Sequence, residues 1–205
     1  FLIIGLMGIL AFPAEAKERA TVISAEIYGY VQDKVYFNFL EEEGINMEFP
    51  YKEGQVMEFT VDLDDVTTLV LNTFIEIYLQ PGDSVHVKVI YDGTRYKSVE
   101  FSGTPAAVAI CSAINKKEML QRERRYKTNI PAMLVTQTDA KKFHAATVKE
   151  IKDEVEIISQ VKDQVDPRVY NMAMAQIEGT LLTNLITYPY ASADFHKKKL
   201  EDCLA

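Results

Sequence analysis

The sequence lacks most of the features that mark an enzyme or a nucleic-acid-binding protein. It has no G-x-S-x-G motif, and none of its three histidines has Cys, His or Asp at metal-ligand spacing. Nothing singles out a pair of carboxylates for glycoside hydrolysis. A formal net charge of −8 disfavours binding to nucleic acid, because phosphate contacts need a basic face. We therefore expect no metal, no cofactor and no nucleic-acid partner.

Cysteine is scarce as well. The only two cysteines in the sequence are Cys111 and Cys203, which are far apart and form no C-x-x-C motif. Cys111 stands among small and branched apolar residues, a pattern typical of a buried thiol rather than a reactive one. A disulfide between the two cysteines is the alternative that this pattern leaves open. The chain as given is therefore not expected to be an enzyme.

No apolar run reaches the roughly 20 residues that a membrane-spanning helix needs. The longest run, residues 1–12, is followed by Pro13 and by Ala14-Glu15-Ala16, a small-residue cleavage pattern. This combination is typical of a secretory signal peptide cleaved after Ala16. We expect residues 1–16 to be a signal peptide and the mature protein to be periplasmic, in a Gram-negative envelope. No integral membrane segment is expected after cleavage.

Residues 17–103 carry the pattern of an antiparallel β domain. Apolar and polar residues alternate with a period of two, as in Met57–Leu63 and in Ile75–Leu79, which predicts strands buried on one face. Pro81-Gly82 fits the centre of a type II turn. Asp92-Gly93 predicts a type I′ hairpin. We expect about eight strands in a sandwich or barrel-like arrangement.

Residues 104–205 change to a helical period. One helix is expected from Pro105 to about Tyr126 and a second from about Asp139. Asp166-Pro167 supplies a cap and a first-turn proline for a third helix, which we expect Tyr188-Pro189-Tyr190 to end. A short charged helix from about Ala193 is expected to finish the chain. Strands followed by helices predict an α+β fold.

Two groups of residues in the strand region are candidates for a binding face. The acidic group Asp62, Asp64 and Asp65 lacks the glycine and the distal glutamate of a calcium loop, so a solvated turn at a strand end is favoured. Tyrosines are concentrated in the same region, and tyrosines that alternate with apolar residues can line a binding face on a sheet. Tyr78 and Tyr96, with the acidic rim, are the positions that we would test first.

Several segments together resemble a known family. They are Ala25-Glu26-Ile27-Tyr28-Gly29, Lys34–Phe37, Leu79-Gln80-Pro81-Gly82-Asp83-Ser84-Val85 and Val99–Gly103, followed by helices. Over residues 21–190 the chain is similar to the N-terminal domain of uncharacterised function that precedes thioredoxin-like domains in exported Bacteroidota proteins of the thiol–disulfide oxidoreductase type. The resemblance implies that a redox C-x-x-C would belong to a downstream domain, so no catalytic residue is assigned here.

These observations favour a non-catalytic periplasmic binding or docking module, part of a larger exported thioredoxin-like protein, with a protein or peptide partner. Two alternatives remain at this point. The chain is the N-terminal region of a thiol–disulfide oxidoreductase whose C-x-x-C domain lies beyond residue 205, or it is a surface protein that binds a glycan or peptide. The sequence does not indicate an oligomeric state.

Overall fold

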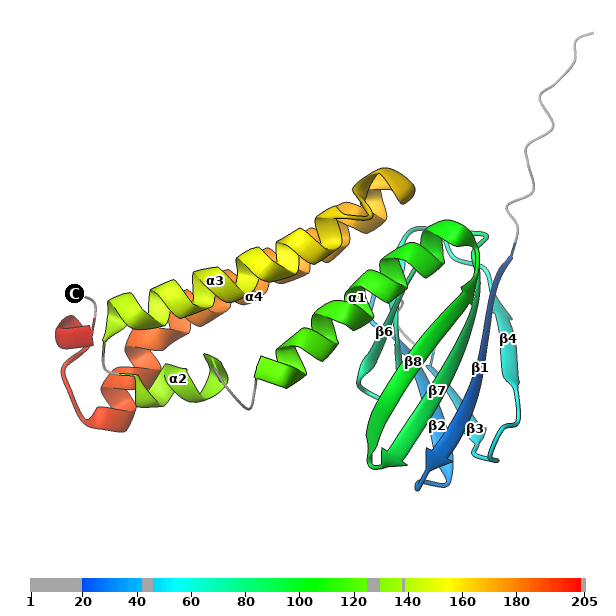
Figure 1. Cartoon of the computed structure of the whole chain (residues 1–205), viewed down its shortest axis with the longest axis horizontal. Coiled ribbons are helices and arrows are strands. Elements are labelled where there is room, and N and C mark those ends of the chain that lie inside the picture. Colours follow the sequence, from blue (N-terminus) through cyan, green and yellow to red (C-terminus); the bar gives the residue numbers. More distant parts are fainter. Residues whose placement is uncertain (1–19, 42–45, 125–129, 138, 204–205) are drawn as a thin grey trace, which may run out of the picture.

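The structure, a computed structural model, describes residues 20–41, 46–124, 130–137 and 139–203. Within these residues, eight strands come first along the chain, and helices follow. Figure 1 shows an elongated molecule with a β-sandwich at one end and two long paired helices that extend toward the other. The predicted α+β class, with a strand half and then a helical half, is confirmed. The predicted signal peptide at residues 1–16 lies outside the described residues.

The sandwich consists of two four-stranded sheets. The first has the order β4-β1-β7-β8, with β1 Thr21–Tyr30, β4 Met57–Val61, β7 Ser84–Gly93 and β8 Arg95–Gly103. The second has the order β3-β2-β5-β6, with β2 Lys34–Phe39, β3 Asn46–Pro50, β5 Thr67–Leu71 and β6 Ile75–Leu79.

One pairing corrects the prediction of a purely antiparallel domain, because β1 pairs with β7 in parallel from Val22↔Ser84 to Tyr30↔Gly93. The chain leaves β1, builds the second sheet and β4, and returns as β7 in the same direction. A long connection of this kind is what parallel neighbours require. The alternation of residues along a strand shows which face is buried but not in which direction its neighbour runs.

The core lies between the two sheets. Ile23, Ile27, Phe37, Leu69 and Ile77 are completely buried there, and each occupies the inward-facing position that the period of two predicts. Asn72, also buried, joins the sheets: its amide oxygen accepts from the Tyr36 N–H at 3.0 Å, and its amide nitrogen donates to the Tyr91 hydroxyl at 3.3 Å. A buried side-chain amide costs free energy unless it is paired, so this bridge favours one relative placement of the sheets.

Two predicted turns can be compared with the structure. Gly82 has φ +85°, and the Asp83 N–H donates to the Gln80 carbonyl at 3.1 Å, as in the predicted type II turn. At the β7–β8 hairpin, Asp92 pairs with Arg95, so the loop residues are Gly93 and Thr94. Gly93 therefore holds the first central position with φ +68°, which is typical of a type II′ turn. The predicted type I′ turn centred on Asp92-Gly93 was wrong by one residue.

In the described part of the chain, four α-helices follow the strands. They are α1 Pro105–Arg124, α2 Ile130–Thr136, α3 Ala140–Ser159 and α4 Pro167–His196, with short 3-10 turns at Lys162–Gln164 and Leu200–Cys203. The predicted cap at Asp166 is confirmed, because its carboxylate accepts from the Arg168 N–H. The predicted start of the second helix near Asp139 is also confirmed, and the Asp139 carboxylate accepts from the N–H groups of Lys141 and Lys142. The sequence did not predict α2.

The end predicted for the third helix was wrong, because α4 continues through Pro189 to His196. Proline removes one backbone hydrogen bond within a helix, which normally disfavours continuation. Here tertiary packing compensates: the Tyr188 ring stacks on Phe143 with a centroid distance of 4.3 Å, and its hydroxyl donates to the Gln137 carbonyl at 2.8 Å. Ala193, where a separate charged helix was expected, is therefore part of α4.

Helix α1 belongs to the sandwich in its packing. Its buried residues Ala107, Ile110, Cys111 and Ile114 form one continuous core with the strands. Because α1 contacts β6, β7 and β8, it covers the side of the sandwich where the edge strands β6 and β8 lie (Figure 1). Edge strands present unpaired backbone groups, and a covering helix protects them.

Candidate docking surface and buried polar junction

The structure buries both tyrosines that the sequence placed on a binding face. Tyr78 is 1% exposed and Tyr96 is 5% exposed. Tyr78 does point away from the sandwich interior, as the alternation predicts, but α4 lies over that face and Gln176 accepts a hydrogen bond from its hydroxyl. The ring of Tyr96 lies under the guanidinium of Arg122 at 3.5 Å, and burial raises its pKa to about 12. Neither ring is available to a ligand in this conformation.

The acidic group, in contrast, is exposed. Asp62, Asp64 and Asp65 all lie at the surface just after β4. Asp65 has a local role, since its carboxylate accepts from the Val66 N–H at 2.7 Å and pairs with Arg168 of α4 at 2.8 Å. This group therefore forms a turn and a contact between the sandwich and the start of α4, and its role in binding stays a prediction.

A cluster of buried and partly buried polar side chains lies where the sandwich meets the helices, and we call it the polar junction. Its members are Glu76 and Tyr78 of β6, Lys117, Glu118 and Gln121 of α1, Glu154 of α3 and Gln176 of α4. Lys117 is 5% exposed and Glu154 is 1% exposed, so both charges are removed from water. Such burial is costly unless the charged groups find partners.

Hydrogen bonds in the junction join α1 to α3 and β6 to α4, and an ion pair lies within α1. Gln121 donates to Glu154 at 2.7 Å, Gln176 donates to Glu76 at 3.2 Å, and the Lys117 ammonium pairs with Glu118 at 3.2 Å. The second carboxylate oxygen of Glu76 is buried and accepts no hydrogen bond from the described residues. The junction thus holds three carboxyl groups around one ammonium group, an excess of negative charge.

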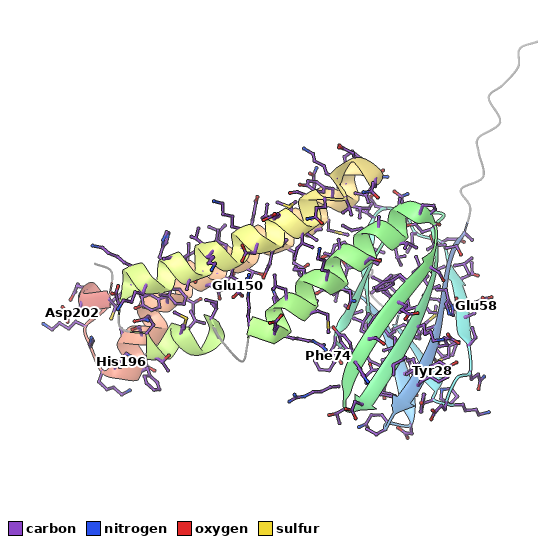
Figure 2. All side chains as sticks on the ribbon, in the orientation of Figure 1. Tyr28, Glu58, Phe74, Glu150, His196 and Asp202 are labelled. Carbon is purple, nitrogen blue, oxygen red and sulfur yellow. The ribbon has the colours of Figure 1, made fainter. Side chains whose placement is uncertain are left out.

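Burial in this junction, more than the excess of negative charge, shifts the pKa of its carboxyl groups. Burial is the largest cause that raises the pKa of Glu76, although the nearby Lys117 ammonium opposes the shift. Burial also raises the pKa of Glu154, against the hydrogen bond from Gln121. Glu150, on the same side of α3 near α1 (Figure 2), has a raised pKa because of burial and the nearby Glu154. We interpret the junction as a joint between the two halves of the molecule that is sensitive to protonation.

Farther along α4 the helix exposes a face with a different character. Residues 179–193 contain no charged side chain, although Asp, Glu, Lys and Arg make up 25% of the sequence. Leu182 is 57% exposed, Ile186 65% and Tyr190 61%, and their spacing of four residues places them in one row along the helix. Gly179, Thr183 and Thr187 form the neighbouring exposed row. We call these six residues the α4 face.

A groove of about 840 Å³ between α1 and α3 is the other large surface feature. Met119, Leu120 and Ile157 give it an apolar floor, but charged side chains surround them, including the Arg124–Asp153 ion pair. Charged groups at such a rim pair with one another and with water, so the groove does not need a partner. The α4 face has no charged side chains that could pair or be hydrated in this way, and we regard it as the candidate functional surface.

The reactive groups of the described chain are enclosed. Cys111 and Cys203 are both free and buried, so the alternative of a disulfide between them is not realised. Burial raises the pKa of the Cys111 thiol to about 12, which keeps it protonated at neutral pH. Within the described residues, no group of three or more His, Cys, Asp or Glu side chains could hold a metal ion. Nor is any described helix long and apolar enough to cross a membrane.

Comparisons with family models, with curated proteins and with solved structures find no match to this chain. Function is therefore inferred from the geometry alone. Ile177, Leu181 and Leu185 lie on the inward side of α4, and the sequence analysis did not single out the opposite side. The signal was present, because a long uncharged stretch in a helix predicts burial on more than one face.

Proposed function

We propose that this chain is a non-catalytic docking module of the periplasm, in which the β-sandwich holds the helices in place and α4 presents the binding face. The observation that carries this proposal is the exposure of Leu182, Ile186 and Tyr190 on a face without charge. Soluble proteins rarely leave such apolar patches uncovered, and those that do commonly use them for binding. The partner is a polypeptide that offers a complementary apolar surface.

The start of α4 is fixed to the sandwich, which supports this arrangement. Arg168 pairs with Asp65, the hydroxyl of Thr68 approaches the Met172 sulfur at 3.9 Å, and Tyr78 donates to Gln176. These contacts hold the first half of the helix on β5 and β6. The second half extends beyond the sandwich, toward the end of the molecule where His196 and Asp202 lie (Figures 1 and 2). The second half also packs against α2 and α3, so the whole helix is held in place and presents its exposed face with little conformational cost on binding.

The wider context is also a proposal. We propose that the protein is exported and that the chain is the N-terminal part of a larger thioredoxin-like protein, in which any thiol chemistry takes place in another domain. The buried, protonated Cys111 supports this division of roles. The gene sequence after the codon for Ala205 tests it: a thioredoxin-like pattern with C-x-x-C supports the larger protein, and a stop codon contradicts it.

Site-specific photo-crosslinking tests the docking function directly. A photoreactive amino acid at position 186, in the centre of the α4 face, is expected to form crosslinks to polypeptide in the cells that produce the protein naturally. The matched control is Lys152, an exposed position on α3, which is expected to form none. A second substitution, Leu182→Glu, should abolish the crosslink from position 186. Equal crosslinking from positions 186 and 152, or none from either, would contradict the docking function.

A further inference from the structure

The exposed side chains of the α4 face differ in size in a way that lets a second copy of the same face pack against it. Its two rows differ in size, since Leu182, Ile186 and Tyr190 form a high row and Gly179, Thr183 and Thr187 form a low row beside it. All six side-chain positions are exposed. Rows with a spacing of four residues are the ridges by which helices most commonly pack together, each ridge lying in a groove of the partner. This face carries both a ridge and a groove.

Gly179 has no function within a single chain. It lies inside a helix, where glycine costs about 1 kcal/mol relative to alanine. A Cβ atom added there would meet no heavy atom within 4 Å, so nothing in the protomer requires the small residue. A large side chain approaching from outside would require it, and the residue that needs the most space on this face is Tyr190.

We propose that a second copy of this chain covers the α4 face in an antiparallel, two-fold arrangement centred between residues 184 and 185. This inference rests on the proposed docking function and names its occupant. In that arrangement every large residue lies opposite a small one: Leu182 opposite Thr187, Ile186 opposite Thr183, and Tyr190 opposite Gly179. A two-fold interface must be self-complementary, and the order of residues along α4 meets that condition.

The charges that flank the face agree with the antiparallel direction. The same symmetry places Glu178 opposite Ala191 and Asp194 opposite Ala175, so no like charges meet. Asp194 is in addition paired with Lys197 within its own chain, at 3.4 Å. A parallel arrangement would instead place Glu178 on Glu178, Tyr190 on Tyr190 and Gly179 on Gly179. Like charges and mismatched sizes disfavour it.

Disulfide trapping can detect both the pair and its direction. Single cysteines are introduced at positions 179, 183, 186 and 190, and the parent chain is the control because Cys111 and Cys203 are buried. Under mild oxidation we expect Gly179→Cys and Tyr190→Cys not to crosslink alone but to crosslink when the two variants are mixed. Thr183→Cys mixed with Ile186→Cys should likewise crosslink in higher yield than either variant does alone. Efficient crosslinking of every variant with itself would show a parallel pair and overturn the proposal.

A variant at Gly179 separates association from folding. Gly179→Gln adds a good helix former at a position with free space in the protomer, so the single chain should fold at least as stably as the parent. The same side chain would occupy the space of Tyr190 from the partner and should weaken the dimer about tenfold or more. The control is Lys152→Gln, at an exposed position on α3. Another glycine such as Gly54 would not serve as the control site, because its φ of +68° disfavours any residue with a side chain.

The outcomes distinguish this inference from the docking function on which it rests. A purified full chain that remains monomeric up to high micromolar concentration overturns the dimer. If position 186 then still crosslinks in cells to a different polypeptide, the docking function stands with another occupant. If it crosslinks to nothing, both are wrong.

Discussion

The β-sandwich and the second half of α4 differ in how completely they bury their apolar side chains. In the sandwich, Ile23, Phe37 and Leu69 have no exposed surface and belong to one continuous core. On α4, Leu182 and Ile186 remain more than half exposed. The most exposed apolar residues of the sandwich, such as Leu40 and Phe74, lie in the connections between strands, whereas those of α4 form one row that a second molecule can cover. The polar junction lies between the two and connects them.

The largest expected effect comes from removing a large side chain in each region. Phe37→Ala leaves a cavity between the sheets and should lower the free energy of unfolding by about 3–5 kcal/mol. Leu182→Ala removes a side chain that is 57% exposed and should change it by less than about 0.5 kcal/mol. Urea denaturation at concentrations where the chain is monomeric measures both. Comparable losses for the two variants would show that Leu182 stabilises the single chain as much as Phe37 does, and would contradict the contrast between the two regions.

A smaller effect, dependent on pH, should come from the junction. Protonation of Glu154 contributes stability that is fully present below the unfolded-state pKa of 4.5 and is lost as the pH rises through the raised folded-state pKa. Glu154→Gln keeps the acceptor for Gln121 and avoids the buried charge. It should therefore stabilise the protein at pH 7 by something on the order of 1 kcal/mol, and the gain should disappear below about pH 4.5.

Denaturation curves of the parent and of Glu154→Gln between pH 4 and pH 8 measure this gain. Glu156→Gln, two residues away and exposed on α3, is the matched control and should show no such dependence. A gain that grows on acidification would reverse the sign and contradict the buried-charge interpretation.

The smallest effect concerns the turn between β5 and β6. Asn72 and Thr73 both have positive φ, +49° and +70°, as a type I′ turn demands, and a β-branched residue is strained in this region. Thr73→Gly creates the preferred Asn-Gly pair and should stabilise the chain by about 1 kcal/mol. The same change in helix α4, Thr187→Gly, should destabilise it by a few tenths of a kcal/mol. Thermal unfolding compares the two, and a loss of stability for Thr73→Gly would show that no strain is present.

Local sequence patterns predicted the strands and helices better than they predicted how these elements pair and pack. The alternation in Ile75–Leu79, the helix start near Asp139 and the cap at Asp166 depend on neighbouring residues, and the structure confirms them. The parallel β1–β7 pair and the continuation of α4 through Pro189 depend on distant contacts, which no local pattern contains. The Asn72-Thr73 turn was not predicted because threonine lacks the conformational freedom of the glycine that normally signals it.

The candidate site illustrates the same limit. Tyr78 was expected on an exposed face because its strand position points away from the sandwich, and that orientation is correct. Its burial comes from Gln176 and the rest of α4, about a hundred residues later in the chain. Conversely, the uncharged stretch 179–193 was visible in the sequence, but only the structure shows that one side of this part of the helix is exposed.

Sedimentation equilibrium tests the central claim, that the uncharged α4 face is a docking surface for a second copy, most directly. Parent protein, Ile186→Glu and the control Val148→Glu, a partly exposed apolar position on α3, are compared over a range of concentrations. The parent and Val148→Glu should approach the mass of a dimer, while Ile186→Glu should retain the 23.2 kDa mass of a single chain. A parent protein with the mass of one chain throughout, or an Ile186→Glu variant that associates as the parent does, would contradict the account.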